Sequence, residues 1–321
     1  MKKILLFVIV TLLCLSCRQQ KIIKVAHRGA SGYLPEHTLE AVALAHSWDI
    51  DYIEPDLVMT KDDQLIVMHD PHLDTTTNVK DLFPNRARAD GRFYAVDFSL
   101  DEIKKLSVHE RVNLETGEAV FPGRFPHGRS HFEVPSFIEY IELVQGLNKS
   151  TGKKIGIIPE IKAPEFHESE GKDIVSKTLF VLKSYGYEEN GQAIIQCFEP
   201  NTLKMIKNKT NIPLLQLIAV NEWKESSADY DKMLTDDGLK EIATYAKYIG
   251  PYLPQLYDIK NDRAFKNDVM KLAHKYDLKV APYTIRDDAI FKPFENKKEM
   301  MSFVLGELEV DGLFSDFADK L

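Results

Sequence analysis

Two acidic residues at a short spacing are the first sign of chemistry in this sequence. Glu54 and Asp56 are separated by one residue within the apolar run 52–59. A strand points such a pair to one face, where two carboxylates repel each other unless a divalent cation binds them. Carboxylate oxygens suit Ca²⁺ or Mg²⁺, and Glu160 is a candidate third ligand. Acids at strand ends are also common without a metal, so the pair alone leaves that alternative open.

Two histidines each end an apolar run. His27 follows residues 22–26, and His69 follows residues 65–68. A single histidine in such a place is more often a hydrogen-bonded structural residue. Two histidines beside a metal site suit a general base and a general acid, although either could instead be a metal ligand.

Basic residues lie next to these groups in the sequence. Arg28 follows His27, and Lys162 lies two residues after Glu160. Cations there suit a phosphoryl group, because its oxygens carry the negative charge of the transition state. A metal site, two histidines and these cations indicate phosphoryl transfer rather than acyl transfer. No Gly-x-Ser-x-Gly motif competes with this interpretation.

The elements that must position these residues alternate along the chain. Short runs rich in Val and Ile, as in buried parallel strands, are mostly followed by longer amphipathic segments. This alternation predicts an α/β fold, a closed (β/α)8 TIM barrel rather than an open doubly wound sheet. The first run is not followed by the Gly-x-Gly-x-x-Gly motif of a dinucleotide fold.

The expected elements can be read directly from these runs. Pro159 falls inside one expected strand, and because proline cannot donate to a strand ladder we expect a bulge there. The expected strands are residues 22–27, 52–59, 65–69, 155–161, 193–198, 214–219, 248–250, 279–285 and 312–315. The expected helices are residues 38–47, 136–147, 171–185, 201–208, 237–246, 263–276 and 297–305.

Glu54 and Asp56 lie within the second expected strand, and the other polar residues named above fall at the carboxyl ends of expected strands. Gln196, Glu199, Tyr283, Arg286 and Asp316 occupy the same kind of position. In a (β/α)8 barrel the carboxyl ends of the strands share one rim, where active sites lie. We therefore expect these residues, distant in sequence, to converge on one site.

Residues 71–133 interrupt the alternation. The segment is rich in Arg, Pro and Gly, and its one helix-like piece, residues 100–106, follows Ser99, a candidate N-cap. A long insertion in a compact domain is usually functional or mobile. We expect a cap beside the barrel mouth, inserted after the third strand-like run.

The first residues have the composition of a secretory signal. Basic residues precede the apolar run 4–15, which is too short to span a bilayer. A small residue directly before Cys17 resembles the bacterial lipobox, although Cys14 stands where leucine is usual. An ordinary signal peptide is the alternative. We expect a lipoprotein signal peptide at 1–16, a lipidated tether at 17–21 and the barrel domain at 22–321.

This N-terminal pattern predicts a location. Lipidation of Cys17 would place the protein in a bacterial cell envelope, on the periplasmic side, with the membrane as a partner. Position 18 is Arg rather than Asp, which favours the outer membrane by analogy with other lipoproteins.

Charge and cysteine content exclude other classes. Residues 1–16 hold two lysines and no acidic residue, so their removal changes the formal net charge from −8 to −10. An acidic protein repels nucleic acid backbones, and we expect no nucleic-acid partner. Cys197 is the one cysteine after Cys17, so the domain has no internal disulfide. It lies in an apolar run, which predicts a buried structural residue rather than a nucleophile.

The motifs resemble the glycerophosphodiester phosphodiesterases, and in particular their periplasmic branch. The resemblance is carried by segments 27–38, 52–57, 67–70 and 159–164. It extends over nearly the whole chain after the N-terminal signal. The further matching segments are 83–92, 140–152, 196–198, 282–286 and 311–317.

This resemblance implies a (β/α)8 barrel with an inserted cap that hydrolyses glycerophosphodiesters, such as glycerophosphocholine or glycerophosphoethanolamine, to sn-glycerol 3-phosphate and an alcohol. One divalent cation is implied, Ca²⁺ first and Mg²⁺ as the alternative. Position 37 is His where the wider family commonly has Asn. The implied roles are His27 and His69 as the acid–base pair, Glu54, Asp56 and Glu160 as metal ligands, Arg28 and Lys162 at the phosphate, Glu36 at the glycerol end, and Tyr283 and Arg286 as substrate-binding rim residues.

Two alternatives stay open. A related barrel phosphodiesterase could act on lysolipids, although the charged segment 71–133 does not offer the apolar rim that intact lipids require. A non-catalytic surface lipoprotein could keep the fold for binding, but a pure binder needs no combination of histidines and carboxylates.

Overall fold

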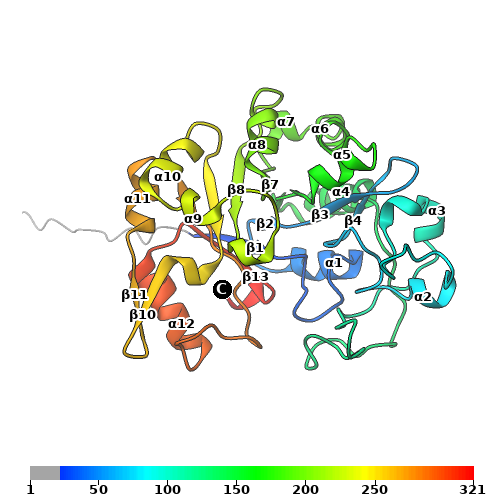
Figure 1. Cartoon of the computed structure of the whole chain (residues 1–321), viewed down its shortest axis with the longest axis horizontal. Helices are drawn as coiled ribbons and strands as arrows, with labels where there is room; N and C mark the ends of the chain where they lie inside the picture. The colour runs from blue at the N-terminus through cyan, green and yellow to red at the C-terminus, as the bar shows by residue number, and fades with distance from the viewer. Residues whose placement is uncertain (1–21) are drawn as a thin grey trace, which may run out of the picture.

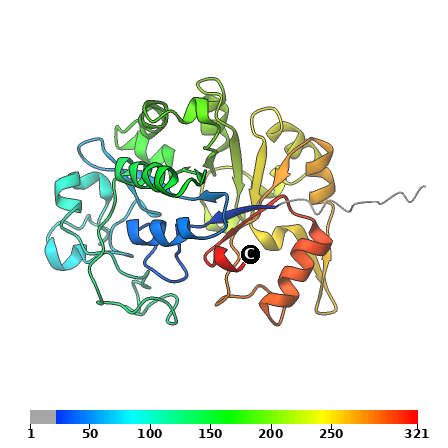
Figure 2. The same cartoon turned by 180° about the vertical axis from the view of Figure 1, so that it is seen from behind.

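The computed structural model describes residues 22–321. The expected signal peptide, the tether and Cys17 lie outside these described residues. Within residues 22–321, the helices are all too short or too polar to cross a membrane. Parallel strands form a central barrel, and helices surround it on the outside (Figure 1, Figure 2).

Eight strand positions make up the barrel wall, and each pairs in parallel with its neighbour in sequence order. The last strand pairs with the first, with Gly312 opposite Ile23. The Asp311 amide donates to the Val280 carbonyl at 2.9 Å and closes the remaining gap. The predicted (β/α)8 barrel is confirmed. Its strands are β1 (Ile23–Ala26), β2 and β3 (Tyr52–Ile53, Asp56–Met59), β5 and β6 (Gly156–Ile157, Glu160–Ile161), β7 (Ile195–Cys197), β8 (Leu214–Ile218), β9 (Tyr248–Pro251), β12 (Lys279–Val280) and β13 (Gly312–Ser315).

The third expected strand, residues 65–69, is not part of the barrel wall. It forms β4 (Leu65–Val67), which runs antiparallel to β3 with Val67 opposite Leu57. The connection from Met59 to Leu65 is too short for a parallel crossover, which needs a dozen or more residues. The apolar run is therefore the second arm of a hairpin.

Two barrel strands are interrupted at the same height by proline. Pro159 separates β5 from β6, so the strand breaks where a bulge was expected, and Pro55 separates β2 from β3 in the same way. The two breaks lie side by side, because the Glu160 amide donates to the Pro55 carbonyl at 2.8 Å. Asp56 and Glu160 directly follow the two prolines and lie opposite each other.

The outer helices largely match the expected ones. Thr38 and Ser136 cap two of them, and Glu139 completes a capping box with Ser136. The long helices are α1 (Leu39–Ser47), α4 (Phe137–Thr151), α6 (Ile174–Ser184), α8 (Pro200–Lys207), α10 (Asp236–Ile242), α11 (Val269–Lys275) and α12 (Lys297–Phe303). The short ones are α2 (Val79–Leu82), α3 (Leu100–Ile103), α5 (Pro164–Ser169), α7 (Tyr187–Asn190) and α9 (Tyr230–Met233), with single turns η1 (Ala95–Asp97), η2 (Asn221–Trp223), η3 (Leu253–Leu256), η4 (Val304–Leu308) and η5 (Ala318–Lys320).

The helix expected at 263–276 was wrong in its first part. Residues in β10 (Tyr257–Lys260) and β11 (Arg263–Lys266) form an antiparallel hairpin, and the helix begins at Val269. Asn261 and Asp262 have φ of 51° and 56°. Two central residues with positive φ favour a two-residue hairpin turn, so the Asn-Asp pair was the missed signal.

The insertion, residues 71–133, lies to one side of the barrel, in cyan to green-cyan beside α1 (Figure 1). It packs around a second hydrophobic core that includes Leu73, Phe98, Ile103 and Leu106, together with Ile66 of β4. Ser99 caps α3, as predicted, in a capping box with Glu102. The insertion is therefore built on the β3–β4 hairpin.

The central barrel core should dominate stability. Ile157 is fully buried, whereas Ile138 on α4 is 40% exposed. We expect Ile157→Ala to lower the free energy of unfolding by about 2–5 kcal/mol, because it leaves a cavity. The matched control, Ile138→Ala, should change it by less than about 1 kcal/mol. Urea unfolding of both variants measures this, and equal losses would contradict the assignment of Ile157 to the core.

Candidate active site

The three acidic residues expected to bind a metal do meet. Glu54, Asp56 and Glu160 are buried, and one carboxylate oxygen of each lies within 4.8 Å of the others. Asp56 and Glu160 begin β3 and β6 and lie opposite each other in the parallel ladder. Glu54 lies in the neighbouring break between β2 and β3. The proline breaks therefore bring the carboxylates together at the barrel mouth.

Basic groups compensate two of these carboxylates. Asp56 Oδ2 lies 2.8 Å from His37 Nε2 and 3.4 Å from Arg28 Nε. Burial alone would raise the pKa of Asp56, but the hydrogen bond and charge of His37, with other nearby cations, hold it well below its usual value. Glu160 lies 2.7 Å from Lys162 Nζ. Its pKa is raised well above normal, because burial outweighs the Lys162 charge and Asp56 adds repulsion.

Glu54 is held by hydrogen bonds from two uncharged donors. The Arg28 amide donates to its Oε2 at 2.8 Å, and Gln196 Nε2 donates to its Oε1 at 3.0 Å. Burial and the charge of Asp56 raise the pKa of Glu54 well above its usual value. Asp56 Oδ1 and Gln196 Oε1 are buried without a hydrogen-bond partner among the described residues. Buried oxygens of this kind need a partner, so the donor set fits a hard divalent cation held by Glu54, Asp56 and Glu160.

The two histidines have matching surroundings. His27 Nδ1 lies 2.6 Å from Asp316 Oδ1, and His69 Nδ1 lies 2.5 Å from Asp70 Oδ1. With Nδ1 bonded to a carboxylate, Nε2 of each ring is the atom left to face a substrate. Lys162 Nζ lies 3.3 Å from His69 Nε2.

Both imidazoles are neutral at neutral pH. Burial and the charge of Arg28 lower the pKa of His27 to about 4. Burial and the charges of Arg28 and Lys162 lower the pKa of His69 to about 3. A neutral imidazole can accept a proton, and a bound anion would favour its protonated form. The pair therefore suits proton transfer to and from an anionic substrate.

Arg28 and Lys162 lie at the same rim in strained backbone. Arg28 has φ of 57°, and Ala163, directly after Lys162, has φ of 40°. Positive φ in non-glycine residues is costly and is found where a site requires it. Here the left-handed positions are Arg28 itself and the residue after Lys162.

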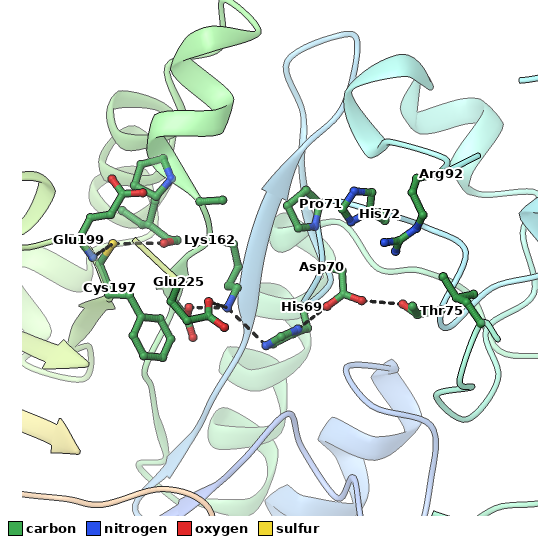
Figure 3. A pocket seen from close by; sticks show the side chains of 16 residues that line it. His69, Asp70, Pro71, His72, Thr75, Arg92, Lys162, Cys197, Glu199 and Glu225 are labelled. Carbon is green, nitrogen blue, oxygen red and sulfur yellow. Dashed lines mark hydrogen bonds and ion pairs between the residues drawn. The ribbon is translucent and has the colours of Figure 1, made fainter. Parts of the chain in front are cut away.

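An inner hollow of about 230 Å³ brings the predicted groups together. It is lined by both histidines, Arg28, two of the carboxylates and the rim residues Tyr283 and Arg286. An adjoining outer hollow of about 360 Å³ has His69 and Lys162 at its border (Figure 3). The residues shared by the two hollows are His69, Glu160, Phe198 and Glu225.

Three predicted residues have positions that refine their expected roles. Tyr283 donates to the Ile218 carbonyl at 3.2 Å, and Arg286 Nε donates to Asp316 at 2.7 Å. Glu36 lies outside the lining of both hollows, and Arg28 and Arg111 hold its two oxygens.

Cys197 is buried as predicted, and burial raises the pKa of its thiol. It is a poor nucleophile.

Some contacts and residues of the site were not found from sequence. Asp70 and Asp316 were placed at the ends of expected strands, but their bonds to His69 and His27 were not predicted. His37 lies between β1 and α1, and its contact with Asp56 had no local signal. Arg111 and Arg124 belong to the insertion and reach the aspartates across 41 and 192 residues of sequence.

Comparisons with known proteins agree with this geometry. The model of the glycerophosphoryl diester phosphodiesterase family matches residues 27–320. A glycerophosphodiester phosphodiesterase of Haemophilus influenzae is 43% identical over 94% of this chain and 89% of its own length. One from Treponema pallidum is 34% identical over 94% and 91%. A solved phosphodiesterase of Oleispira antarctica, in complex with the product sn-glycerol-3-phosphate, covers 93% of this chain and 95% of its own, with a TM-score of 0.63 and 20% identity.

The chain therefore belongs to the glycerophosphoryl diester phosphodiesterase family. This confirms the family and the class of enzyme that the motifs predicted. At 20% identity, the Oleispira structure supports the fold alone. The periplasmic branch and the roles of individual residues stay predictions.

The carboxylate cluster should bind a divalent cation. We expect Ca²⁺ or Mg²⁺ to raise the melting temperature, because it binds the folded state and relieves repulsion between buried acids. Glu160→Gln should weaken cation binding at least about 10-fold, or about 1.4 kcal/mol. Calorimetric titration measures this, with Glu199→Gln of the outer hollow as the matched control. Equal affinity of wild type and Glu160→Gln would contradict the assignment.

Proposed function

We propose that the chain hydrolyses glycerophosphodiesters, such as glycerophosphocholine or glycerophosphoethanolamine, to sn-glycerol 3-phosphate and an alcohol. One divalent cation takes part, with Ca²⁺ as first choice and Mg²⁺ as the alternative. The observation that carries this proposal is the meeting of His27 and His69 on one hollow with the carboxylate cluster. The names of the Haemophilus and Treponema relatives support the same reaction.

The acidic residues of the site would bind a cation, and the basic residues would bind the phosphate. A bound cation supplies charge neutralisation and Lewis acidity, and Glu54, Asp56 and Glu160 would hold it. Arg28 and Lys162 bind and neutralise the phosphate oxygens. Together these groups orient a doubly esterified phosphate between the two imidazoles.

Proton transfer falls to the histidines. One Nε2 removes a proton from the attacking oxygen, which belongs either to water or to a neighbouring glycerol hydroxyl that forms a cyclic intermediate. The other ring, which takes up a proton at Nε2 when the anionic substrate binds, donates that proton to the oxygen of the leaving alcohol. Asp316 and Asp70 hold Nδ1–H of His27 and His69, which fixes the tautomer that this chemistry requires.

Each histidine should be essential for turnover. We expect His27→Ala and His69→Ala to lower kcat at least about 10²-fold, the low end for acid–base groups. The assay follows sn-glycerol 3-phosphate released from glycerophosphocholine with Ca²⁺, with Mg²⁺ and with chelator. His131→Ala is the matched control, since that side chain is 62% exposed in the insertion.

The outcomes separate the candidate functions. Near-normal turnover in either active-site variant would remove that histidine from the mechanism. Turnover of lysophospholipid vesicles, without turnover of glycerophosphocholine, would favour the lipid phosphodiesterase. No turnover of either by folded protein with any cation would favour a binding lipoprotein.

We also propose a lipid anchor at Cys17 that holds the enzyme at the periplasmic side of a bacterial envelope, at the outer membrane. β1 begins at Ile23, at the end of the barrel opposite the rim that carries His27. The six-residue step from Cys17 to Ile23 reaches about 20 Å at most. The rim would then face away from the lipid surface, which suits small water-soluble diesters.

The anchor has its own test. We expect Cys17→Ala to move the protein from the membrane fraction to the soluble fraction of fractionated cells, because the acyl chains that hold it are lost. Cys197→Ala is the matched control and should stay with the membranes. Membrane association of Cys17→Ala equal to wild type would contradict lipidation at this residue.

A further inference from the structure

The two histidines share an arrangement that extends into the insertion. Each Nδ1 is bonded to one oxygen of an aspartate, and the second oxygen of that aspartate meets an arginine of residues 71–133. Asp70 Oδ2 accepts from Arg111 Nη1 at 2.7 Å, and Asp316 Oδ2 accepts from Arg124 Nη2 at 2.7 Å. A similar arrangement is thus built twice from distant parts of the chain, with the difference that Asp316 Oδ2 also accepts from Arg286 Nε at 2.7 Å.

Arg111 links the insertion to the barrel at His69. Besides Asp70, it donates from Nη2 to Glu36 Oε1 at 2.6 Å. Thr75, also in the insertion, donates to Asp70 Oδ2 at 2.6 Å, so His69, Asp70 and Thr75 form a continuous line (Figure 3). The Asp70 carboxylate therefore has fixed partners on both oxygens.

Arg124 makes the corresponding link at His27. Its side chain is 5% exposed and also donates to Asp288 and to the Ser31 carbonyl. The guanidinium lies 3.7 Å from the ring centroid of Phe121. Such a planar fork, stacked and bonded on several sides, can hold a carboxylate in one orientation.

We propose that Arg111 and Arg124 are positioning residues for catalysis, so that the insertion completes the acid–base machinery. Each acts through an aspartate: Arg111 through Asp70 on His69, and Arg124 through Asp316 on His27. A small misplacement of a proton-transfer group lowers the rate steeply, because the reacting atoms must be aligned. This inference rests on the proposed roles of the two histidines.

The test replaces each arginine by an uncharged side chain of similar length. We expect Arg111→Met and Arg124→Met to lower kcat about 10–100-fold, the range for partners of reactive groups, and to change KM less than about 3-fold. The corresponding Lys variants should have intermediate kcat values, because they keep the positive charge but lose the planar, two-pronged hydrogen bonding of arginine. Arg88→Met is the matched control. Arg88 is also in the insertion and pairs with Asp97 and Glu170. The kcat of Arg88→Met should stay within about twofold of wild type.

Double variants show whether each arginine acts through its aspartate. Arg111→Met should have little further effect on kcat in an Asp70→Asn background, since the two act as one unit. Arg124→Met should likewise have little further effect in Asp316→Asn. The effect of Arg88→Met on the free energy of activation should add to that of Arg111→Met or Arg124→Met.

The results separate this inference from the proposed function. No turnover of glycerophosphocholine by folded wild type with any cation would overturn the proposed function itself. Full activity of His27→Ala or His69→Ala would remove that histidine from the mechanism, and with it the positioning role of its arginine. Loss of activity in the histidine variants, with wild-type kcat in folded Arg111→Met and Arg124→Met, would overturn the positioning role alone. A rise in KM at unchanged kcat in Arg111→Met would assign Arg111 to substrate binding through Glu36 instead. If a Met variant does not fold, wild-type kcat in its Lys counterpart would overturn the role of that arginine.

Discussion

Repulsion among Glu54, Asp56 and Glu160 is the interaction around which the rest of the site is arranged. One oxygen of each lies within 4.8 Å of the others, in a buried place where charges are weakly screened. Arg28 and Lys162 offset part of this repulsion, yet the pKa values of Glu54 and Glu160 stay raised by burial. The same two cations lower the pKa of the neighbouring histidine His69. Metal site, phosphate site and proton-transfer groups are therefore one electrostatic unit.

This unit extends outward as a chain of alternating charges that ends on the neutral imidazole of His69. Breaking a buried ion pair is costly because it leaves one charge without a partner, so each member is held by the next. Glu36 joins Arg28 of the barrel to Arg111 of the insertion. This link explains why Glu36 lies away from both hollows. The chain runs through Asp56, Arg28, Glu36, Arg111, Asp70 and His69.

How much the sequence could predict depends on whether a feature is set locally. The barrel and the meeting of Glu54, Asp56 and Glu160 were predictable, because strand ends in this fold share one rim. The antiparallel course of β4 was missed, although residues 60–64 between the two expected strands are too few for a parallel crossover. The contacts of Arg111 and Arg124 were not predictable, because they depend on how an irregular insertion docks on the barrel.

The insertion also explains how the two histidines keep their separation. His27 follows Ala26 of the barrel core, whereas His69 follows Met68, which packs in the second core with the insertion. The residues before the two histidines therefore pack in different cores, although β4 also ties His69 to the barrel, because Val67 packs in the barrel core and the Met68 amide donates to the Asp56 carbonyl at 2.9 Å. Arg124, which joins the insertion to Asp316 and Asp288, and Arg111, which joins it to Glu36, fasten one core to the other. On the proposed mechanism, a substrate that spans both histidines therefore contacts groups whose positions depend on both cores.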